Sequence, residues 1–164
     1  MTNTEKNLAA AFAGESQANR KYLAFAKQAD AEGHAQVAKL FRAAAEAETI
    51  HAHSHLKVMG VVKSTAENLK AAIQGETYEF EQMYPGFIKE AETENNAAAV
   101  RSFMFANDTE KVHAELYTKY LNNLDKKAVT DLYLCVACGH IAEGSAPDKC
   151  PVCGAAAKAY KKVD

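Results

Sequence analysis

The stretch ETIH at residues 48–51 has a counterpart in EKVH at residues 110–113. On a helix, a glutamate and a histidine three positions apart lie on one face, one turn from each other. A further glutamate precedes each stretch: Glu15 lies 33 positions before the first and Glu76 lies 34 positions before the second. Two lone carboxylates and two such pairs, each on its own helix, form the ligand set of a carboxylate-bridged two-metal site. The sequence therefore predicts a mainly α-helical fold, a four-helix bundle around a two-metal centre.

A single Glu-x-x-His step is common on exposed helices, where it marks only two solvent-facing side chains. The full pattern is more specific, because it needs an acidic position in each of four helices and a histidine at the same offset in two. Buried carboxylates are costly unless they bind a cation or form pairs. A site with many glutamates and two histidines favours iron or manganese over zinc. Glu79, one turn after Glu76, adds a second carboxylate to the face of the third helix.

The first 124 residues are rich in Ala, Glu, Lys and Leu, which favours long helices. The two halves of this region form a weak internal repeat, because Tyr22 follows Glu15 by seven positions and Tyr84 follows Glu76 by eight. Ser64 and Glu67 have the spacing of a capping box. Helices are expected at residues 4–32, 34–60, about 65–94 with a kink or interruption at Pro85-Gly86, and from the turn at Asn95-Asn96 to Leu124.

The C-terminal segment changes character, because all four cysteines lie there in two C-x-x-C-G stretches. Such paired stretches are typical of a tetrahedral four-thiolate metal site, with each glycine adopting a positive φ beside the sulfurs. Zinc at this site would be structural, whereas iron would relay one electron at a time. Disulfides are the alternative interpretation. Short strands are expected at 133–135 and around Ile141, and a unit this small needs a metal to stabilise it. The cysteines are Cys135, Cys138, Cys150 and Cys153.

Charge and hydropathy exclude several classes of function. The net charge of −2 and the pI of about 6.3 argue against a nucleic-acid-binding protein. Residues 1–15 lack the basic and apolar regions of a signal peptide, and no apolar run approaches the length of a membrane span. We therefore expect a cytoplasmic protein that does not bind membranes or nucleic acid.

Three stretches resemble the rubrerythrin family: GESQA at 14–18, GETYE at 75–79 with MYP at 83–85, and CPVCG at 150–154. The resemblance extends over nearly the whole chain. It implies a ferritin-like di-iron bundle in residues 1–127, followed by a rubredoxin-like Fe(Cys)4 domain in residues 128–164. It further implies a non-haem di-iron peroxidase that reduces hydrogen peroxide to water in oxidative-stress defence.

The resemblance also implies roles for individual residues. Glu48 and Glu110 would bridge the two irons, and one iron would move on reduction from Glu79 to His51. Tyr22 and Tyr84 would stand beside the site, although both could equally be ordinary bundle core. The cysteines would hold a third iron, with zinc as a possible substitute. The implied di-iron ligands are Glu15, Glu48, His51, Glu76, Glu79, Glu110 and His113.

Two other functions remain open from the residues. The same bundle could belong to an iron-oxidising or iron-storing ferritin relative, or to a non-catalytic protein that binds partners through a zinc knuckle. The carboxylate of Glu79 and the cysteine segment favour the peroxide reductase. Its electrons must come from an external donor, a rubredoxin or an NAD(P)H-dependent reductase, because the chain has no Gly-rich nucleotide-binding turn.

The connection between the second and third helices is short for a ferritin-like bundle, which has a long crossover there. Glu48 lies 12 residues before Gly60, about 18 Å of helix, and Glu76 lies 10 residues after Ala66, about 15 Å. A parallel arrangement within one chain must therefore return about 33 Å, whereas the six residue steps available reach only about 20 Å. This mismatch predicts a homodimer that exchanges helical hairpins. The alternative is an up-down-up-down bundle within one chain.

Overall fold

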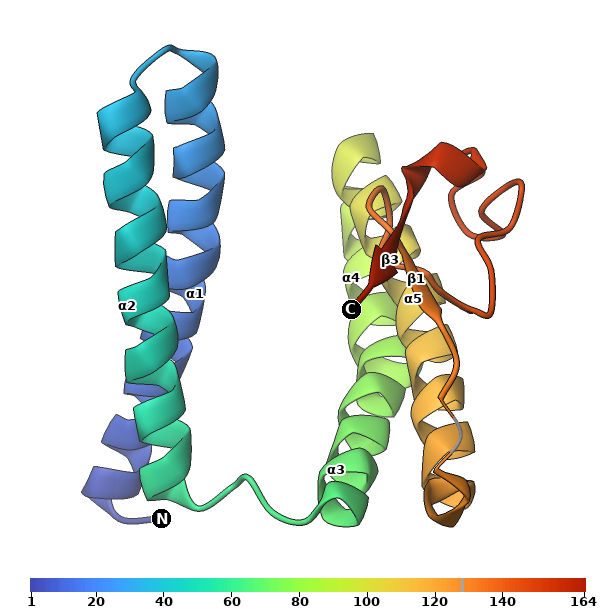
Figure 1. Ribbon diagram of the computed structural model, residues 1–164, viewed down its shortest axis with the longest axis horizontal. Coiled ribbons are helices and arrows are strands. Elements are labelled where there is room, and N and C mark those ends of the chain that lie inside the picture. The colour runs from blue at the N-terminus through green and yellow to red at the C-terminus, as the bar shows by residue number, and fades with distance from the viewer. Residues whose placement is uncertain (128) are drawn as a thin grey trace. The chain divides into compact units, whose positions relative to one another are not determined.

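The computed structural model describes residues 1–127 and 129–164 (Figure 1). The chain divides into two compact units, Met1–Lys63 and Ser64–Asp164. The first unit is a helical hairpin, and the second is another hairpin followed by a small antiparallel sheet. This composition confirms the predicted fold class. Ala128, where the second domain is predicted to begin, lies outside the described residues.

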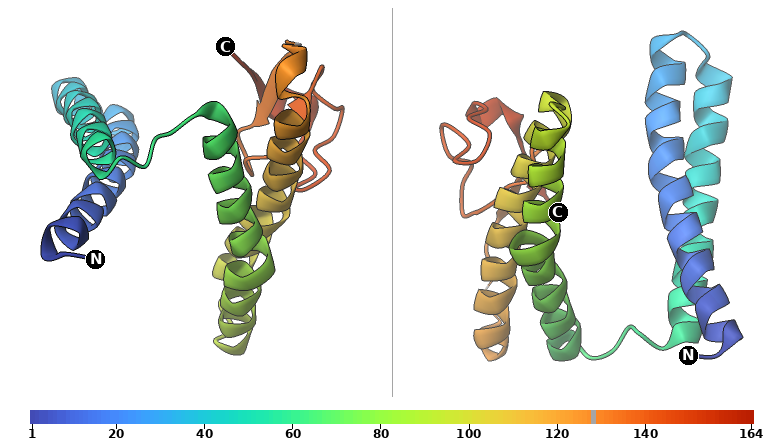
Figure 2. Two further views of the ribbon diagram at one scale, coloured as in Figure 1. Left: turned by 90° about the horizontal axis from the view of Figure 1, so that it is seen from below. Right: turned by 180° about the vertical axis from the view of Figure 1, so that it is seen from behind.

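The first hairpin consists of α1 (Asn3–Ala31) and α2 (Ala35–Met59), which lie side by side in every view (Figures 1 and 2). Thr2 starts α1 with a capping box, because its hydroxyl accepts from the Glu5 N–H at 3.2 Å. Gly33 and Gly60 end the two helices at φ of 81° and 64°, as predicted from the sequence. Small side chains let the helices approach closely; the buried ones are Ala26, Ala29, Ala38, Ala45 and Ala52.

The second hairpin pairs a segmented helix with α5 (Ala97–Asn122). The segmented helix consists of α3 (Thr65–Tyr78), a π-helical turn η1 (Glu79–Met83) and α4 (Tyr84–Thr93). The predicted capping box is present, because the Ser64 hydroxyl accepts from the Glu67 N–H at 3.3 Å and the Glu67 carboxylate accepts from the Ser64 N–H. The Asn96 side chain caps α5 by accepting from the Ala99 N–H.

The predicted interruption at Pro85 takes the form of the π-helical turn. Proline lacks an N–H, and in an α-helix its ring would collide with the carbonyl four residues earlier, that of Glu81. The wider turn begins at Glu79, whose carbonyl accepts from the Tyr84 N–H five residues later. Such turns often occur at functional sites.

The π-helical turn also absorbs the one-residue difference between the two halves of the repeat. Tyr22 contacts Phe25 and Phe41 with ring centroids 6.3 and 6.2 Å away. Tyr84 makes the same contacts with Phe87 and Phe103, both at 6.2 Å. Each of the three aromatic residues in the second unit lies 62 positions after its counterpart. The two hairpins therefore have one internal design, with one residue inserted in the second.

The C-terminal sheet has the strand order β2-β1-β3, all antiparallel. Its strands are β1 (Leu132–Cys135), β2 (Ile141–Glu143) and β3 (Tyr160–Val163). The first two correspond to the predicted strands, whereas β3 was not predicted, because its two lysines resemble a solvated tail. A short 3-10 turn, η2 (Leu124–Lys126), precedes the sheet. A second one, η3 (Ala157–Ala159), precedes strand β3.

Two side chains of α5 connect the second hairpin to this sheet. The Tyr120 hydroxyl donates to Glu143 Oε1 at 2.8 Å, and Lys119 forms an ion pair with the same carboxylate. In the described part of the chain, no helix combines the length and the apolar character that a membrane span requires.

Candidate metal centres

The four cysteine sulfurs gather between the two C-x-x-C-G turns. Sγ–Sγ distances are 3.8 Å between Cys135 and Cys153 and 3.6 Å between Cys138 and Cys150. A tetrahedral metal with bonds of about 2.3 Å to sulfur places its ligands about 3.8 Å apart. A disulfide would need about 2.05 Å, and all four cysteines are free. The arrangement therefore fits a four-thiolate metal site and excludes the disulfide interpretation.

Backbone N–H groups point at these sulfurs. Gly139 and Gly154 have φ of 93° and 75°, the positive values predicted for the residue after each second cysteine. Burial raises the pKa of the Cys138 thiol on balance, although a backbone hydrogen bond from His140 opposes this effect. At Cys150, burial acts to raise the pKa, but hydrogen bonds, chiefly from the Cys153 N–H and the Tyr160 hydroxyl, lower it to about 6. The site thus favours thiolate at Cys150, as metal binding requires.

In the first unit, Glu15, Glu48 and His51 bring their ligand atoms within 4.8 Å of one another. The His51 Nδ1 lies 3.0 Å from Glu48 Oε2. A hydrogen bond with Glu48 raises the pKa of Glu15, and the same bond lowers the pKa of Glu48. The His51 side chain is 56% exposed, whereas that of Glu48 is only 17% exposed. The imidazole is therefore the most exposed group of this triad.

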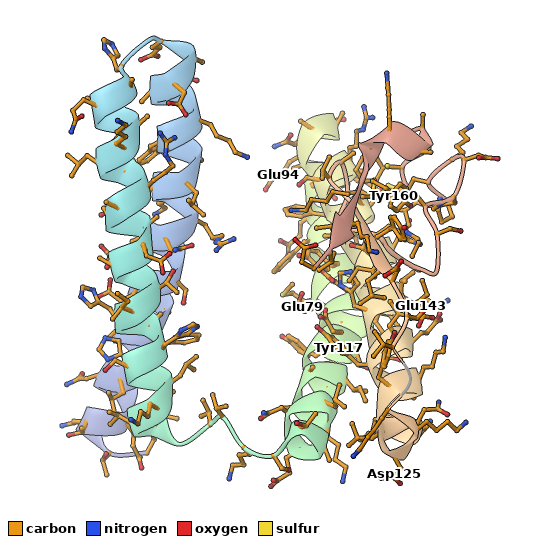
Figure 3. The ribbon with its side chains drawn as sticks, viewed as in Figure 1. Glu79, Glu94, Tyr117, Asp125, Glu143 and Tyr160 are labelled. Carbon is orange, nitrogen blue, oxygen red and sulfur yellow. The ribbon has the colours of Figure 1, made fainter. Side chains whose placement is uncertain are left out.

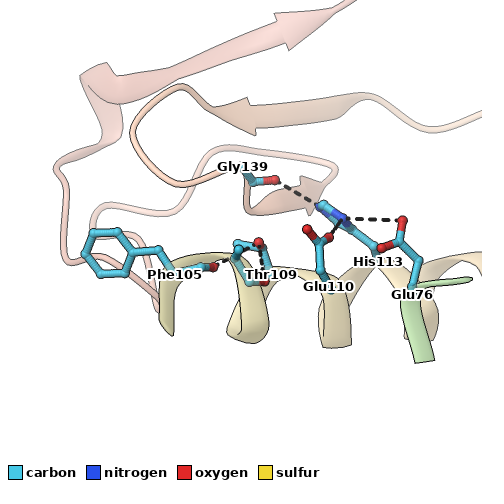
Figure 4. A network of polar contacts seen from close by, with 7 residues as sticks. Glu76, Phe105, Thr109, Glu110, His113 and Gly139 are labelled. Carbon is cyan, nitrogen blue, oxygen red and sulfur yellow. Dashed lines mark hydrogen bonds and ion pairs between the residues drawn. The ribbon is translucent and has the colours of Figure 1, made fainter. Parts of the chain in front are cut away.

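In the second unit, Glu76, Glu110 and His113 form a matching triad within 4.8 Å (Figure 4). The His113 Nδ1 lies 2.7 Å from Glu110 Oε2 and 3.9 Å from Glu76 Oε1. Burial raises the pKa of Glu76 to about 7, and the neighbouring Glu110 adds to the effect. A bound cation would remove this penalty, because it stabilises the ionised carboxylates.

The other nitrogen of His113 connects the triad to the cysteine site. Its Nε2 lies 3.0 Å from the carbonyl oxygen of Gly139, the residue after Cys138 (Figure 4). A carbonyl only accepts hydrogen bonds, so Nε2 carries a hydrogen, and Nδ1 is the nitrogen that could bind a metal as a neutral imidazole. This is the tautomer that a metal at Nδ1 needs, and such outer contacts commonly orient a ligating histidine.

Glu79 lies beside the second triad but outside its compact cluster, half-buried at the start of η1 (Figure 3). Burial raises the pKa of Glu79, and the charge of Glu110 adds to the shift. Burial also raises the pKa of Tyr84, and the largest charge effect on it comes from Glu79. These three groups are therefore neighbours. Tyr22 lies within its aromatic cluster in the first unit.

Tyr117, which was not among the predicted site residues, is half-buried on α5 one turn after His113 (Figure 3). Burial raises its pKa, and the charges of Glu76 and Glu110 add to the shift, so its hydroxyl lies near both carboxylates. The spacing of four from His113 and seven from Glu110 could have identified it, because those offsets lie on one helix face.

We predict that the Glu76 carboxyl makes the metal-free protein less stable as the pH rises. Its folded pKa of about 7 lies above its ordinary value of 4.5, so the folded state holds a proton that the unfolded chain releases. This contribution to stability is present below pH 4.5 and is lost through pH 7. Thermal unfolding of metal-free protein between pH 5 and 8 should show a smaller fall in Tm for Glu76→Gln than for the wild type. An equal fall in both would contradict the prediction, and the exposed Glu90→Gln serves as a control.

Comparison with known proteins extends over both parts of the chain. The rubrerythrin family model matches residues 6–121, and that of the rubrerythrin rubredoxin-like domain matches residues 133–161. Nigerythrin of Nitratidesulfovibrio vulgaris is 40% identical over 165 residues, which cover 92% of this chain and 82% of nigerythrin. A rubrerythrin of Porphyromonas gingivalis is 35% identical, with 93% and 86% covered. The structure of fully reduced, all-ferrous nigerythrin matches with a TM-score of 0.61 and 36% identity over 99% of this chain and 88% of that one. The chain therefore belongs to the rubrerythrin family.

Proposed function

We propose that this chain reduces hydrogen peroxide to water at a di-iron site held by Glu15, Glu48, His51, Glu76, Glu79, Glu110 and His113. The observation that carries the proposal is the hydrogen bond between His113 and Gly139, which joins the carboxylate site to the cysteine site. An iron-storing ferritin relative would have no use for this connection. The cofactors are the two irons of the ferritin-like bundle and one iron in the rubredoxin-like site.

The reaction consumes one peroxide, two electrons and two protons, and it forms two water molecules. The iron pair, when bound, supplies the two electrons. The chain has to position the peroxide and deliver the protons. Tyr84 and Tyr117 keep their hydroxyl protons, because burial and the nearby carboxylates raise both pKa values. We assign Tyr84 to hydrogen-bond the peroxide oxygens, with Tyr22 in the equivalent role in the other hairpin.

The electron path within the second unit is short. It runs from Cys138 through the peptide unit of Gly139 and one hydrogen bond to the His113 imidazole. Two peroxide electrons require two successive passages, because a four-thiolate iron carries one at a time. We propose that an external rubredoxin or NAD(P)H-dependent reductase supplies them, and that the protein works in the reducing cytoplasm, where its four thiols stay unpaired.

We further propose that two chains exchange hairpins. Each unit holds one Glu-Glu-His triad, so one two-metal site needs both kinds of hairpin. The connection between Met59 and Thr65 is too short for a parallel return within one ferritin-like bundle, as the comparison of about 33 Å with about 20 Å shows. Exchange of an element between protomers is a low-cost route to a twofold dimer.

The presence of iron in the cysteine site can be tested by visible absorption spectroscopy. Protein purified from iron-replete cells should contain iron at Cys135, Cys138, Cys150 and Cys153 and should show iron–thiolate charge-transfer bands. Reduction should bleach these bands, and a Cys150→Ser variant should lose them. A colourless protein with full zinc occupancy would contradict this assignment.

Removal of Glu79 should slow peroxide turnover without unfolding the bundle. In Glu79→Ala the other six ligands can still hold metal, but the carboxylate that is the seventh ligand is lost. We expect at least a ~10-fold loss of peroxide reduction, consistent with a missing positioned group. The matched control is Glu81→Ala, an exposed residue of the same π-helical turn. In the wild type, peroxide consumption should exceed dioxygen consumption severalfold, and equal rates would argue for an oxidase.

Hairpin exchange predicts complementation between two inactive variants. After co-refolding of Glu48→Ala with Glu110→Ala, an exchanged heterodimer contains one intact site and one doubly damaged site. An equal mixture should recover about one quarter of wild-type activity by random pairing. The control mixture, Glu48→Ala with His51→Ala, damages the first half-site of both chains and should stay inactive. If both mixtures stay inactive, each site is built from a single chain.

A further inference from the structure

A side-chain oxygen inside the second hairpin lacks a hydrogen-bond partner. Asn107 is half-buried on α5, and its Oδ1 exposes less than 1 Å² to solvent. Within residues 1–127 and 129–164, no donor reaches this oxygen. Buried polar groups of folded proteins are nearly always hydrogen-bonded, because an unpaired one reduces stability. The oxygen of Asn107 therefore points to a partner that is not part of the chain.

A neighbouring carboxylate orients the amide of Asn107. The exposed Asp108 accepts a hydrogen bond through Oδ1 from Asn107 Nδ2 at 3.5 Å. An ionised carboxylate only accepts hydrogen bonds, so the amide nitrogen belongs on this outer side and the amide oxygen on the buried side. Asn107 thus presents an acceptor, and not a donor, to the interior of the hairpin.

Helix spacing places Asn107 between the carboxylate cluster and an aromatic cluster. It lies three positions before Glu110 and four positions after Phe103, so the three side chains share one face of α5. Glu110 belongs to the second triad, and the ring of Phe103 lies 6.2 Å from that of Tyr84. The buried oxygen is therefore one helical turn from a proposed iron ligand, on the side of the site where Tyr84 lies.

The first hairpin has a buried asparagine in the same layer, and that asparagine is fully hydrogen-bonded. The offset of 62 residues that relates the aromatic clusters matches Asn107 to Ala45. In the first hairpin, Asn19 Nδ2 donates to the Ala45 carbonyl at 2.6 Å and to the Thr49 hydroxyl at 2.8 Å. Its Oδ1 accepts from Arg20 at 2.8 Å. The second hairpin carries its buried amide on the other helix of the pair, so the contacts that satisfy Asn19 are not available to Asn107.

Hydrogen peroxide and dioxygen differ in what they can donate, because peroxide has two O–H groups and dioxygen has none. We propose that Asn107 Oδ1 accepts a hydrogen bond from an O–H group of hydrogen peroxide, and that this contact selects peroxide over dioxygen. A site built to pair with a substrate O–H discriminates against an analogue that lacks it, since the buried acceptor is then left unpaired. The inference rests on the proposed function and adds a specificity-determining residue to it.

The first test compares the two substrates in full-length, iron-loaded protein with an artificial reductase. Asn107→Leu keeps the approximate shape but removes the acceptor. We expect kcat/KM for peroxide to fall about 3- to 10-fold, as for one lost hydrogen bond, and kcat/KM for dioxygen to stay unchanged. Thr109→Val is the matched control, because the Thr109 hydroxyl is also buried but donates to the carbonyls of Phe105 and Ala106 on its own helix (Figure 4). It should keep the wild-type ratio.

Peroxide binding provides a second measurement that needs no turnover. Zinc has no redox chemistry, so full-length protein loaded with zinc can bind peroxide without reducing it. The dissociation constant is read from the nuclear magnetic resonance signals of α5 backbone amides during titration with peroxide. It should be about 3- to 10-fold higher in Asn107→Leu than in the wild type or Thr109→Val. An unchanged dissociation constant or an unchanged ratio of activities in Asn107→Leu would overturn the proposal.

Thermal unfolding of the metal-free variants separates the effect on peroxide from an effect on folding. Asn107→Leu should be at least as stable as Thr109→Val, because it removes an oxygen without a partner and not a hydrogen-bonded hydroxyl. A larger fall in Tm for Asn107→Leu would show that Oδ1 already has a partner and would contradict the assignment. If the zinc-loaded protein binds peroxide through Asn107 but the iron-loaded protein reduces none, the proposed function alone is wrong.

Discussion

Clustered carboxylates within each of the two hairpins impose the main constraint on this molecule. Each unit gathers two glutamates and a histidine within 4.8 Å, an arrangement in which like charges repel and burial disfavours ionisation. The pKa of about 7 at Glu76 and the raised pKa of Glu15 are the consequences in the metal-free chain. A bound cation would remove both penalties, because it stabilises the ionised carboxylates.

His113 joins the two metal centres because both of its nitrogens are engaged. One faces Glu110 at 2.7 Å, and the other donates to the Gly139 carbonyl at 3.0 Å. The contacts of Lys119 and Tyr120 with Glu143 hold the same sheet against α5 two turns further along. The position of the cysteine site is thus fixed by side chains that also lie next to the carboxylate site. A shift of the sheet would break the hydrogen bond between His113 and Gly139. The proposed electron path would then be interrupted, and Nε2 of His113 would lose the acceptor that keeps its hydrogen in place.

Much of this arrangement could be predicted from periodicity and spacing. Helix ends at Gly33 and Gly60 and the capping box at Ser64 follow from local chemistry, and the Glu-x-x-His spacing alone places each pair on one face. Contacts between distant segments could not be predicted in this way. The bond from His113 to Gly139 joins residues 26 positions apart. Strand β3 forms because the backbone of β1 supplies its hydrogen-bond partners. This pairing outweighs the weak strand preference of its two exposed lysines. The π-helical turn replaced a predicted kink because Pro85 restricts the helix without specifying how it adjusts.

The inserted residue makes the two Glu-Glu-His triads unequal, and the inequality has a chemical meaning. Glu79 follows Glu76 by three positions, whereas the residue at the same offset from Glu15 is Ala18. The second unit therefore offers an extra carboxylate, and the first offers an exposed imidazole, because the His51 side chain is 56% exposed, whereas that of His113 is 17% exposed and has contacts at both ring nitrogens. A carboxylate suits ferric iron and an imidazole suits ferrous iron. The proposed exchange of a metal ligand between Glu79 and His51 would therefore use the extra carboxylate of the second unit and the exposed imidazole of the first.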